Sequence, residues 1–174
     1  MSQPTDDDVF LPSGFVDREA FSPAAGAALD RAVEAARQTR WETVRSPHVF
    51  MGLVAVPDET IGHWGFQLGV DLARVWGQFR RTFLLREAPV PLVRLHREFW
   101  SRTAIEVLRL ARNRCAKQGH HLISPADLLT SLLVRDGCVT AAFAPSGLAV
   151  PVMLAVLAEA EARFDVVPGA SHSS

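Results

Sequence analysis

Three residues of the first half, Ser46, His48 and Asp58, have the types that a serine hydrolase uses. A serine nucleophile needs a histidine base that a carboxylate orients, and in one large hydrolase class it sits in a Gly-x-Ser-x-Gly turn. No such turn surrounds Ser46, and both Ser46 and Asp58 stand where a helix start needs a capping side chain. We therefore expect no catalytic residue here, and we interpret His48 as a structural hydrogen-bonding residue.

A second group, His120, His121 and Asp127, has side chains of the types that bind metal ions. The two histidines are adjacent at the end of a predicted helix, and Asp127 lies in the first turn of the next one. Helix-end and capping roles explain all three residues, so we expect no metal site. We expect no cofactor either. The chain contains no phosphate-binding loop of the form GxxxxGK[ST], so we expect no ATP hydrolysis by that mechanism.

The composition indicates a globular protein without a nucleic-acid or membrane surface. Hydrophobic residues make up 48% and charged residues 21% of the 174 residues, and the formal net charge is -1. This balance gives no basic excess for binding nucleic acid. No apolar run approaches the ~20 residues of a membrane span, and the start, MSQPTDDDVF, lacks the features of a signal peptide. We therefore expect a cytoplasmic protein.

The two cysteines, Cys115 and Cys138, lie far apart in the sequence and form no Cys-x-x-Cys motif. In a reducing compartment the expected state at each position is a buried free thiol. A disulfide or a reactive thiol is the alternative.

Apolar periodicity with start and stop signals predicts eight helices, and therefore an all-α fold. In the first half we expect helices over about 23–39, 47–56, 59–68 and 72–86. Phe21-Ser22-Pro23 and Ser46-Pro47 each place a capping serine before a first-turn proline. Gly69 is placed to end the third helix. The apolar face of the first helix is rich in alanine, so this helix can approach its neighbours closely.

The second half repeats this plan, with expected helices over about 102–118, 125–135, 138–143 and 151–164. We call the alignment that places Trp100 on Phe21 the repeat register; it also pairs Ser22 with Ser101, Leu29 with Leu108 and Val44 with Ile123. The Ser-Pro steps align better one position out of this register, so we expect the sixth helix to start one residue early. Agreement in the order of caps, breaks and apolar faces indicates an internal duplication.

The duplication predicts five segments along the chain. We expect a flexible segment at 1–19, a first repeat at 20–86, a connector at 87–98, a second repeat at 99–165 and a disordered tail at 166–174. Pro89 and Pro91 prevent a regular helix in the connector, whereas its apolar residues predict that it packs onto the domain. Phe10, Leu11, Phe15 and Val16 in the first segment could also pack there.

These motifs resemble the Clp N-terminal repeat, two copies of which form the N-terminal domain of Clp unfoldases. The first copy rests on Phe21-Ser22-Pro23, Ser46-Pro47-His48-Val49-Phe50-Met51-Gly52-Leu53 and Leu68-Gly69-Val70-Asp71. The second rests on Trp100-Ser101, Gly119-His120, Pro125-Ala126-Asp127-Leu128-Leu129 and Gly147-Leu148. The resemblance covers about residues 20–164 and implies two pseudo-symmetric four-helix repeats. With no phosphate-binding loop in the sequence, we expect a free-standing domain without the AAA+ ATPase modules.

In some members of this family the domain binds phosphorylated arginine through a Thr-Glu segment in each repeat. The matching segments here are Ser46-Pro47 and Pro125-Ala126, so both glutamates are absent. A carboxylate is the group that pairs with a guanidinium. We therefore expect no binding of phosphoarginine.

The resemblance implies a non-catalytic protein- or peptide-binding module that acts as an adaptor, competitor or modulator of Clp-type proteolysis. The expected partners are Clp ATPase or protease components, their clients or their adaptors. We predict a binding surface in the groove between the repeats, with candidate residues Phe21, Trp41, Arg45, Ser46, Pro47, His48, Val90, Arg94, Arg97, Trp100, His121, Pro125 and Ala126. Trp41 is expected to be an exposed aromatic anchor. The alternative is a small-molecule sequestering or sensing protein that uses the same cleft.

Overall fold

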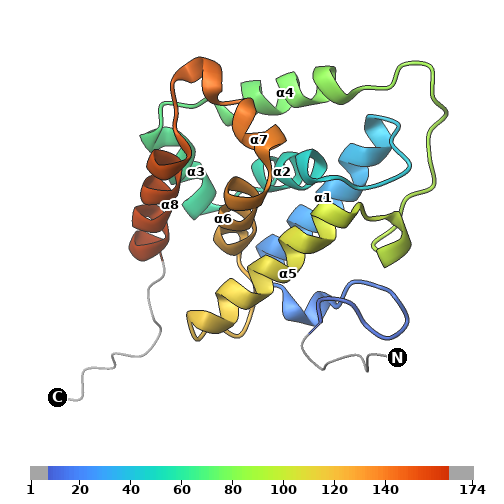
Figure 1. Ribbon diagram of the computed structural model, residues 1–174, viewed down its shortest axis with the longest axis horizontal. Coiled ribbons are helices and arrows are strands. Elements are labelled where there is room, and N and C mark those ends of the chain that lie inside the picture. The colour runs from blue at the N-terminus through green and yellow to red at the C-terminus, as the bar shows by residue number, and fades with distance from the viewer. Residues whose placement is uncertain (1–7, 165–174) are drawn as a thin grey trace.

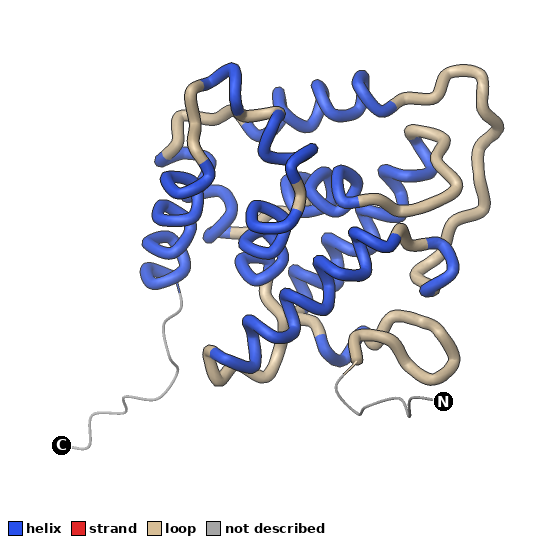
Figure 2. The backbone as a smooth tube through the Cα atoms, in the orientation of Figure 1, coloured by secondary structure: helices blue, strands red, loops and turns tan. Residues whose placement is uncertain are grey.

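The computed structural model describes residues 8–164, which form eight α-helices in two successive groups of four (Figures 1 and 2). The first repeat comprises α1 (Pro23–Gln38), α2 (Ser46–Ala55), α3 (Glu59–Gln67) and α4 (Leu72–Phe83). The second comprises α5 (Arg102–Lys117), α6 (Pro125–Arg135), α7 (Gly137–Ala141) and α8 (Val150–Phe164). Three 3-10 turns accompany them: η1 (Arg18–Ala20), η2 (Arg97–Phe99) and η3 (Ala144–Ser146). The all-α prediction with two four-helix repeats is confirmed; the tail expected at 166–174 lies outside the described residues.

The helix ends lie within two residues of their expected positions, except at α4. This helix ends at Phe83 and not at about 86, because the chain beyond it bonds to the turn after α1. The N–H of Leu85 donates to the carbonyl of Thr39 (3.0 Å). The side chain of Arg40 donates to the carbonyls of Arg86 (2.7 Å) and Ala88 (2.9 Å). Sequence periodicity carries no information about these contacts between distant residues.

Two matching sets of backbone hydrogen bonds join the repeats to each other. The N–H of Ser22 donates to the carbonyl of Ile123 (2.9 Å), and the N–H of Ile123 donates to the carbonyl of Ala20 (2.9 Å). The same two bonds recur at the equivalent positions of the repeat register, from Ser101 to Val44 (2.9 Å) and from Val44 to Phe99 (2.7 Å). Each repeat therefore pairs the entry of its first helix with the turn before the second helix of the other repeat.

The second helices of the two repeats start at equivalent positions, so the expected one-residue offset of α6 is wrong. The N-caps are Arg45 for α2 and Ser124 for α6, which coincide in the repeat register, and Ser46 is the first helical residue. The starts are equivalent because, in both helices, the side chain of the third helical residue accepts the backbone N–H of the N-cap residue. His48 Nδ1 accepts the N–H of Arg45 (3.0 Å), and Asp127 Oδ2 accepts the N–H of Ser124 (2.9 Å).

Small residues bring α1 and α2 into direct contact. A Cβ added at Gly52 would lie 2.1 Å from the carbonyl oxygen of Ala28 and 2.8 Å from the nitrogen of Ala32. Both alanines are buried. The close approach expected for the alanine-rich face of the first helix is therefore confirmed, and the glycine in α2 is what completes it.

Packing between the repeats makes one continuous core. Helices α2 and α6 contact each other near the centre of the molecule, and α3 lies alongside α8 at one end (Figure 1). Trp64 of α3 is fully buried, and its indole N–H donates to the carbonyl of Met153 in α8 (3.0 Å). Among residues 8–164, no helix combines the length and apolar character that crossing a bilayer demands.

Part of the segment 8–19 packs on the domain: Phe10 and Val16 do so as expected, whereas Leu11 and Phe15 are exposed. Val9 and Phe10 are buried, as is Val16. The N–H of Val16 donates to the carbonyl of Leu95 in the connector (2.9 Å). The apolar side chains and this pairing with the connector hold the segment in place. Within the connector Val93 is buried whereas Val90 is exposed; the segment boundaries themselves stay predictions.

Candidate functional site

A hollow of about 500 Å³ lies between the two repeats, and we call it the inter-repeat hollow. Its first-repeat wall consists of Trp41, Arg45, Ser46, Pro47, His48 and Phe83, and its second-repeat wall consists of Ser101, Arg102, Thr103, Asp136 and Cys138. The starts of α2 and α5 therefore face the same space. Five residues chosen from the sequence, at positions 41 and 45–48, lie together in this wall.

Trp41 forms a fixed part of this wall. Its indole N–H donates to the carbonyl of Phe83 at the end of α4 (2.6 Å). The guanidinium of Arg45 lies over the ring, 5.0 Å from its centroid. Trp41 is therefore half-buried and not the exposed anchor expected from its place in a turn. The bond to the distant Phe83 is the reason, and it leaves part of the ring facing the hollow.

His48 is buried beneath the hollow and uses both of its ring nitrogens. Nδ1 accepts the N–H of Arg45, and Nε2 lies 3.0 Å from Oγ1 of Thr39. Since the Thr39 hydroxyl donates to the carbonyl of Ala35 (2.7 Å), Nε2 carries the proton that His48 donates. Burial, with a smaller contribution from Arg45, lowers the pKa of His48 to about 4. The imidazole is therefore neutral at pH 7.

Asp58, the third residue of the possible triad, lies elsewhere. Its carboxylate accepts the N–H of Ile61 (2.9 Å) at the start of α3, and it lines a different hollow from Ser46 and His48. The three residue types are thus present in the sequence without being assembled in space. Each of the two ionisable side chains, His48 and Asp58, is engaged at a helix start.

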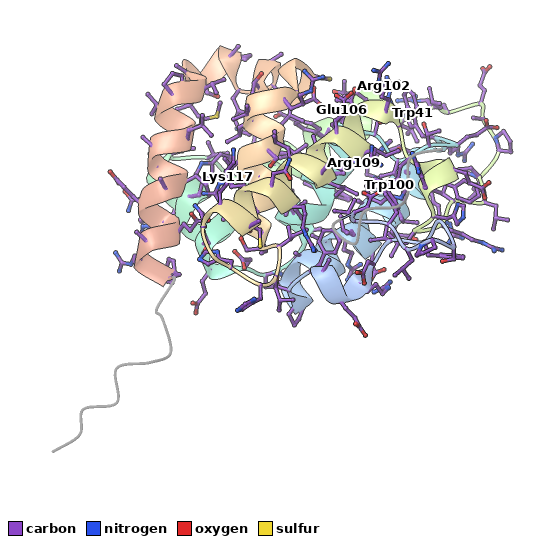
Figure 3. All side chains as sticks on the ribbon, turned by 60° about the horizontal axis from the view of Figure 1, so that its bottom comes forward. Trp41, Trp100, Arg102, Glu106, Arg109 and Lys117 are labelled. Carbon is purple, nitrogen blue, oxygen red and sulfur yellow. The ribbon has the colours of Figure 1, made fainter. Side chains whose placement is uncertain are left out.

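The wall of the inter-repeat hollow includes carbon surface, the guanidinium groups of Arg45 and Arg102, and the carboxylate of Asp136. Ser101 caps α5 by accepting the N–H of Ala104 (3.2 Å), which leaves the N–H groups of Arg102 and Thr103 without intrahelical partners. The guanidinium of Arg102 is exposed and donates to Glu106 on the same helix (3.3 Å). Figure 3 labels both residues on α5. The ring of Trp41 and the guanidinium groups at positions 45 and 102 favour an anionic ligand with an apolar part.

The two remaining polar groups of the wall come from the step between α6 and α7. Asp136 caps α7 by accepting the N–H of Cys138 (2.7 Å). Cys138 is an exposed free thiol, so the expectation of two buried thiols is confirmed for Cys115 and wrong for Cys138. In this five-residue helix Val139 is the buried residue, which leaves its neighbour at the hollow. Although the residue is exposed, partial burial of its sulfur and, to a smaller extent, the charge of Asp136 raise the pKa of Cys138, which disfavours the reactive thiolate.

A smaller hollow of about 100 Å³ is the counterpart of the first. It is lined by Asp58, Thr60, His120, Ser124, Pro125, Ala126, Glu161 and Phe164. In the repeat register, His120 and Ser124–Ala126 take the places of Trp41 and 45–47. Pro125 and Ala126, chosen from the sequence, therefore face a different space from Pro47.

An ion-pair cluster stands in the second repeat where the first has the neutral His48. Asp127 is fully buried and accepts a hydrogen bond from Arg114. The guanidinium of Arg114 also binds both oxygens of Glu161 in α8 (2.7 and 2.9 Å). Burial opposes a charge on Glu161, but the bonds from Arg114 outweigh it and lower the pKa of that carboxyl. Arg114 and Glu161 lie on helices far apart in the chain, and no local signal in the sequence connects them.

The other residues chosen from the sequence lie outside both hollows. Phe21 and Trp100 are buried and belong to the paired segments that join the repeats. Val90, Arg94 and Arg97 are exposed on the connector, and His121 is exposed in the turn after α5. The hollow instead uses Phe83, Arg102, Thr103, Asp136 and Cys138, which sequence reasoning missed. Asp58 and Asp136, which cap α3 and α7, lie within one position of each other in the repeat register. This correspondence could have pointed to Asp136 and to the nearby Cys138.

No three His, Cys, Asp or Glu side chains within residues 8–164 come together as a group that could hold a metal ion. Asp127, a possible ligand by type, is committed to Arg114 and Ser124. His121 is exposed and lines neither hollow.

Solved structures with the same fold include three N-terminal domains of Clp-type proteins. The Hsp104 N-terminal domain from Candida albicans has a TM-score of 0.68 at 17% identity, over 85% of this chain and 94% of that chain. The N-terminal domain of ClpD from Arabidopsis thaliana gives 0.64 at 17% identity, over 86% and 97%. The N-domain of ClpV from Vibrio cholerae gives 0.64 at 14% identity, over 93% and 94%.

A comparison of the sequence with curated proteins gives no match. The family model described as the Clp repeat (R) N-terminal domain matches residues 20–145, which includes helices α1 to α7. Because this match spans most of the chain and the fold agrees with it, the chain belongs to the Clp repeat N-terminal domain family.

Proposed function

We propose that this chain is a non-catalytic module of the cytoplasm that binds a peptide segment of client or partner proteins for a Clp-type ATPase. The observation that supports it most is the inter-repeat hollow, where Trp41, Arg45 and Arg102 meet at the starts of two helices. Such a surface offers stacking, apolar contact and charge-assisted hydrogen bonds to one short segment. The 174 residues contain no phosphate-binding loop, so the proposal assigns recognition and not ATP hydrolysis to them.

The charge of the hollow favours an acidic segment over phosphoarginine. The two positions matching the family glutamates hold Pro47 and Ala126, so neither offers a carboxylate to a guanidinium. Arg45 and Arg102 instead present guanidinium groups. A peptide carboxylate beside an apolar side chain fits this arrangement, because guanidinium and carboxylate groups pair in a bidentate geometry.

Fluorescence anisotropy with labelled decapeptides tests the proposal. We compare an acidic peptide rich in Glu and Leu, its lysine counterpart, and a peptide that carries phosphoarginine. The acidic peptide should bind best, and Arg102→Gln should weaken it about tenfold through loss of one charged contact. The matched control is Arg109→Gln, since Arg109 lies on the same helix outside the hollow (Figure 3). Equal binding of all three peptides, unchanged in Arg102→Gln, rejects the proposal.

The adaptor or modulator role needs a separate experiment. Pull-down from native lysate with the folded wild-type chain should recover a Clp ATPase, a Clp client or an adaptor, and Arg102→Gln should recover less of it. If the well-folded bait recovers none of these proteins, the peptide-binding proposal can stand while the Clp-linked role fails.

A second candidate function is the sequestering or sensing of a small molecule. It is favoured by the volume of the inter-repeat hollow, because about 500 Å³ lies within the ~300–1,000 Å³ range of small-molecule sites. A ligand screen by tryptophan fluorescence tests it, since Trp41 faces the hollow and the chain has no tyrosine. A compound that binds wild type but not Trp41→Phe, while acidic peptides bind neither, favours this alternative.

A further inference from the structure

A separate hollow of about 380 Å³ lies between α5 and α6, and we call it the α5–α6 groove. Helix α5 lines it with Leu110, Asn113, Arg114, Lys117 and Gln118, and α6 lines it with Thr130, Ser131 and Val134. It shares no residue with the inter-repeat hollow. Figure 3 shows Lys117 at the opposite end of α5 from Arg102, so the two surfaces lie well apart on that helix.

The first repeat explains why this groove is open. There, Gly52 of α2 lies directly on the backbone of α1 at Ala28, so the two helices leave little room between them. In the repeat register these residues become Ser131 and Val107, which are both larger. The hydroxyl of Ser131 donates a hydrogen bond to the carbonyl of Asp127, one turn earlier in the same helix (2.8 Å). Helices α5 and α6 are therefore kept further apart at their outer face.

Two side chains that line the groove from opposite sides, Leu110 and Val134, are more apolar or larger than their first-repeat counterparts. Leu110 is 37% exposed at the position where the first repeat has Arg31, and Val134 is 60% exposed where it has Ala55. All four positions lie on the surface, so the exchange does not serve the core. Exposed apolar side chains that face each other across a hollow are typical of a docking surface.

The charge at one end of the groove differs in the same comparison. Lys117 replaces Gln38, and Asn113 replaces Glu34. Lys117 forms no ion pair within residues 8–164, whereas Arg114 is neutralised by its two carboxylate partners. The groove therefore has an apolar centre and, at Lys117, a cation available to a partner. This combination favours a partner with an apolar face and a carboxylate at its edge.

We propose that the α5–α6 groove docks an amphipathic helix of a partner protein. Apolar side chains one turn apart on that helix contact Leu110 and Val134, and an acidic side chain pairs with Lys117. A helix suits a groove between two helices because its side-chain ridges fit there. The described residues offer no sheet edge to which an extended peptide could add. This surface is independent of the function proposed above.

The probe is a designed 16-residue helical peptide with leucines at i, i+3, i+4 and i+7 and glutamates beside them. Its binding to the full chain is followed by fluorescence anisotropy and by amide chemical shifts. Leu110→Arg and Val134→Ala install the first-repeat residues at exposed positions, so both variants should fold. We expect saturable binding, weakened about tenfold in either variant, with shifts at α5 and α6. Val152→Ala, an exposed residue of α8, is the matched control and should bind as wild type.

The charge prediction has its own comparison. Lys117→Glu should weaken the acidic peptide and strengthen a version in which lysines replace the glutamates. Binding that is unchanged in Leu110→Arg and Val134→Ala overturns the proposal. So do shifts confined to the inter-repeat hollow with loss of binding in Arg102→Gln. Self-association of the wild type that Val134→Ala abolishes, without peptide binding, overturns it in favour of a second copy of the chain.

Discussion

At the residue scale, His48 and Asp127 both accept a hydrogen bond at a helix start, one with an imidazole and the other with a carboxylate. Both are the third residue of an equivalent helix, both are buried, and both accept the backbone N–H of the N-cap residue. His48 remains neutral and bonds to Thr39, whereas Asp127 is paired with Arg114. The same backbone group is therefore satisfied by a neutral imidazole in one repeat and by an ion-paired side chain in the other.

Protonation of His48 should destabilise the fold as the pH falls. Because its folded-state pKa is about 4 and its ordinary value is 6.5, the unfolded chain binds the proton first. The stabilisation is complete above pH 6.5 and is lost as the pH falls towards 4, about 3 kcal/mol in total. Urea unfolding of wild type and His48→Gln between pH 7.5 and 4 measures it. The slope in this window should be smaller in His48→Gln, and identical slopes would falsify a neutral buried imidazole.

Removal of the Arg114 guanidinium should destabilise the second repeat by about 3–5 kcal/mol, because it leaves Asp127 buried without a cation. The control Arg109→Met breaks an exposed pair with Asp8 and should cost less than about 1 kcal/mol. Denaturant unfolding of Arg114→Met measures the loss. The double variant Arg114→Ala with Asp127→His recreates the first-repeat residue types and should recover part of it. A double variant less stable than Arg114→Ala alone contradicts this interpretation.

Sequence reasoning at this scale found buried structural roles but missed their partners. It interpreted His48 as a hydrogen-bonding residue because it lay at an apolar helix start, and the structure shows that role. It had no means of connecting Trp41 with Phe83 or Arg114 with Glu161, since each pair is formed only when separate helices pack.

At the element scale, helix ends followed from local chemistry wherever the partner was local. Ser22, Ser101 and Ser124 cap their helices as expected, and Gly69 and Gly119 adopt the left-handed conformation that ends α3 and α5. The cap of α2 did not follow: Arg45 and not Ser46 is the N-cap residue, and its N–H donates to Nδ1 of His48 at the third helical position.

A methyl group at Gly52 should force α1 and α2 apart. Its Cβ would lie 2.1 Å from a backbone oxygen, which cannot move without displacing α1, so Gly52→Ala should cost at least ~2 kcal/mol. The matched control is Gly62→Ala in α3, where a Cβ meets nothing within 4 Å. That change should stabilise the chain by about 0.5–1 kcal/mol, because it restricts the unfolded chain. Urea unfolding of both variants checks this, and similar midpoints for the two would contradict it.

At the scale of the whole molecule, neither repeat has a complete core of its own. The backbone bonds at Ile123 and Val44 and the bond from Trp64 to Met153 all cross between the repeats. We expect fragments 8–86 and 87–164 each to show little helical circular dichroism alone, and a mixture of them to regain it. Cooperative thermal unfolding of either fragment alone would show instead that one repeat suffices.

The sequence by itself determined the helices, their duplication and the family, because caps, breaks and apolar spacing are local features that recur in the repeat register. Only the tertiary structure decided that Ser46–His48 and Pro125–Ala126 face two separate hollows, and that Arg102 and Cys138 join the larger one. It also decided that part of the segment 8–19 packs on the connector and that the α5–α6 groove is open. The physical reason is that a surface is formed by side chains from distant segments, whose relative positions depend on how closely helices can pack.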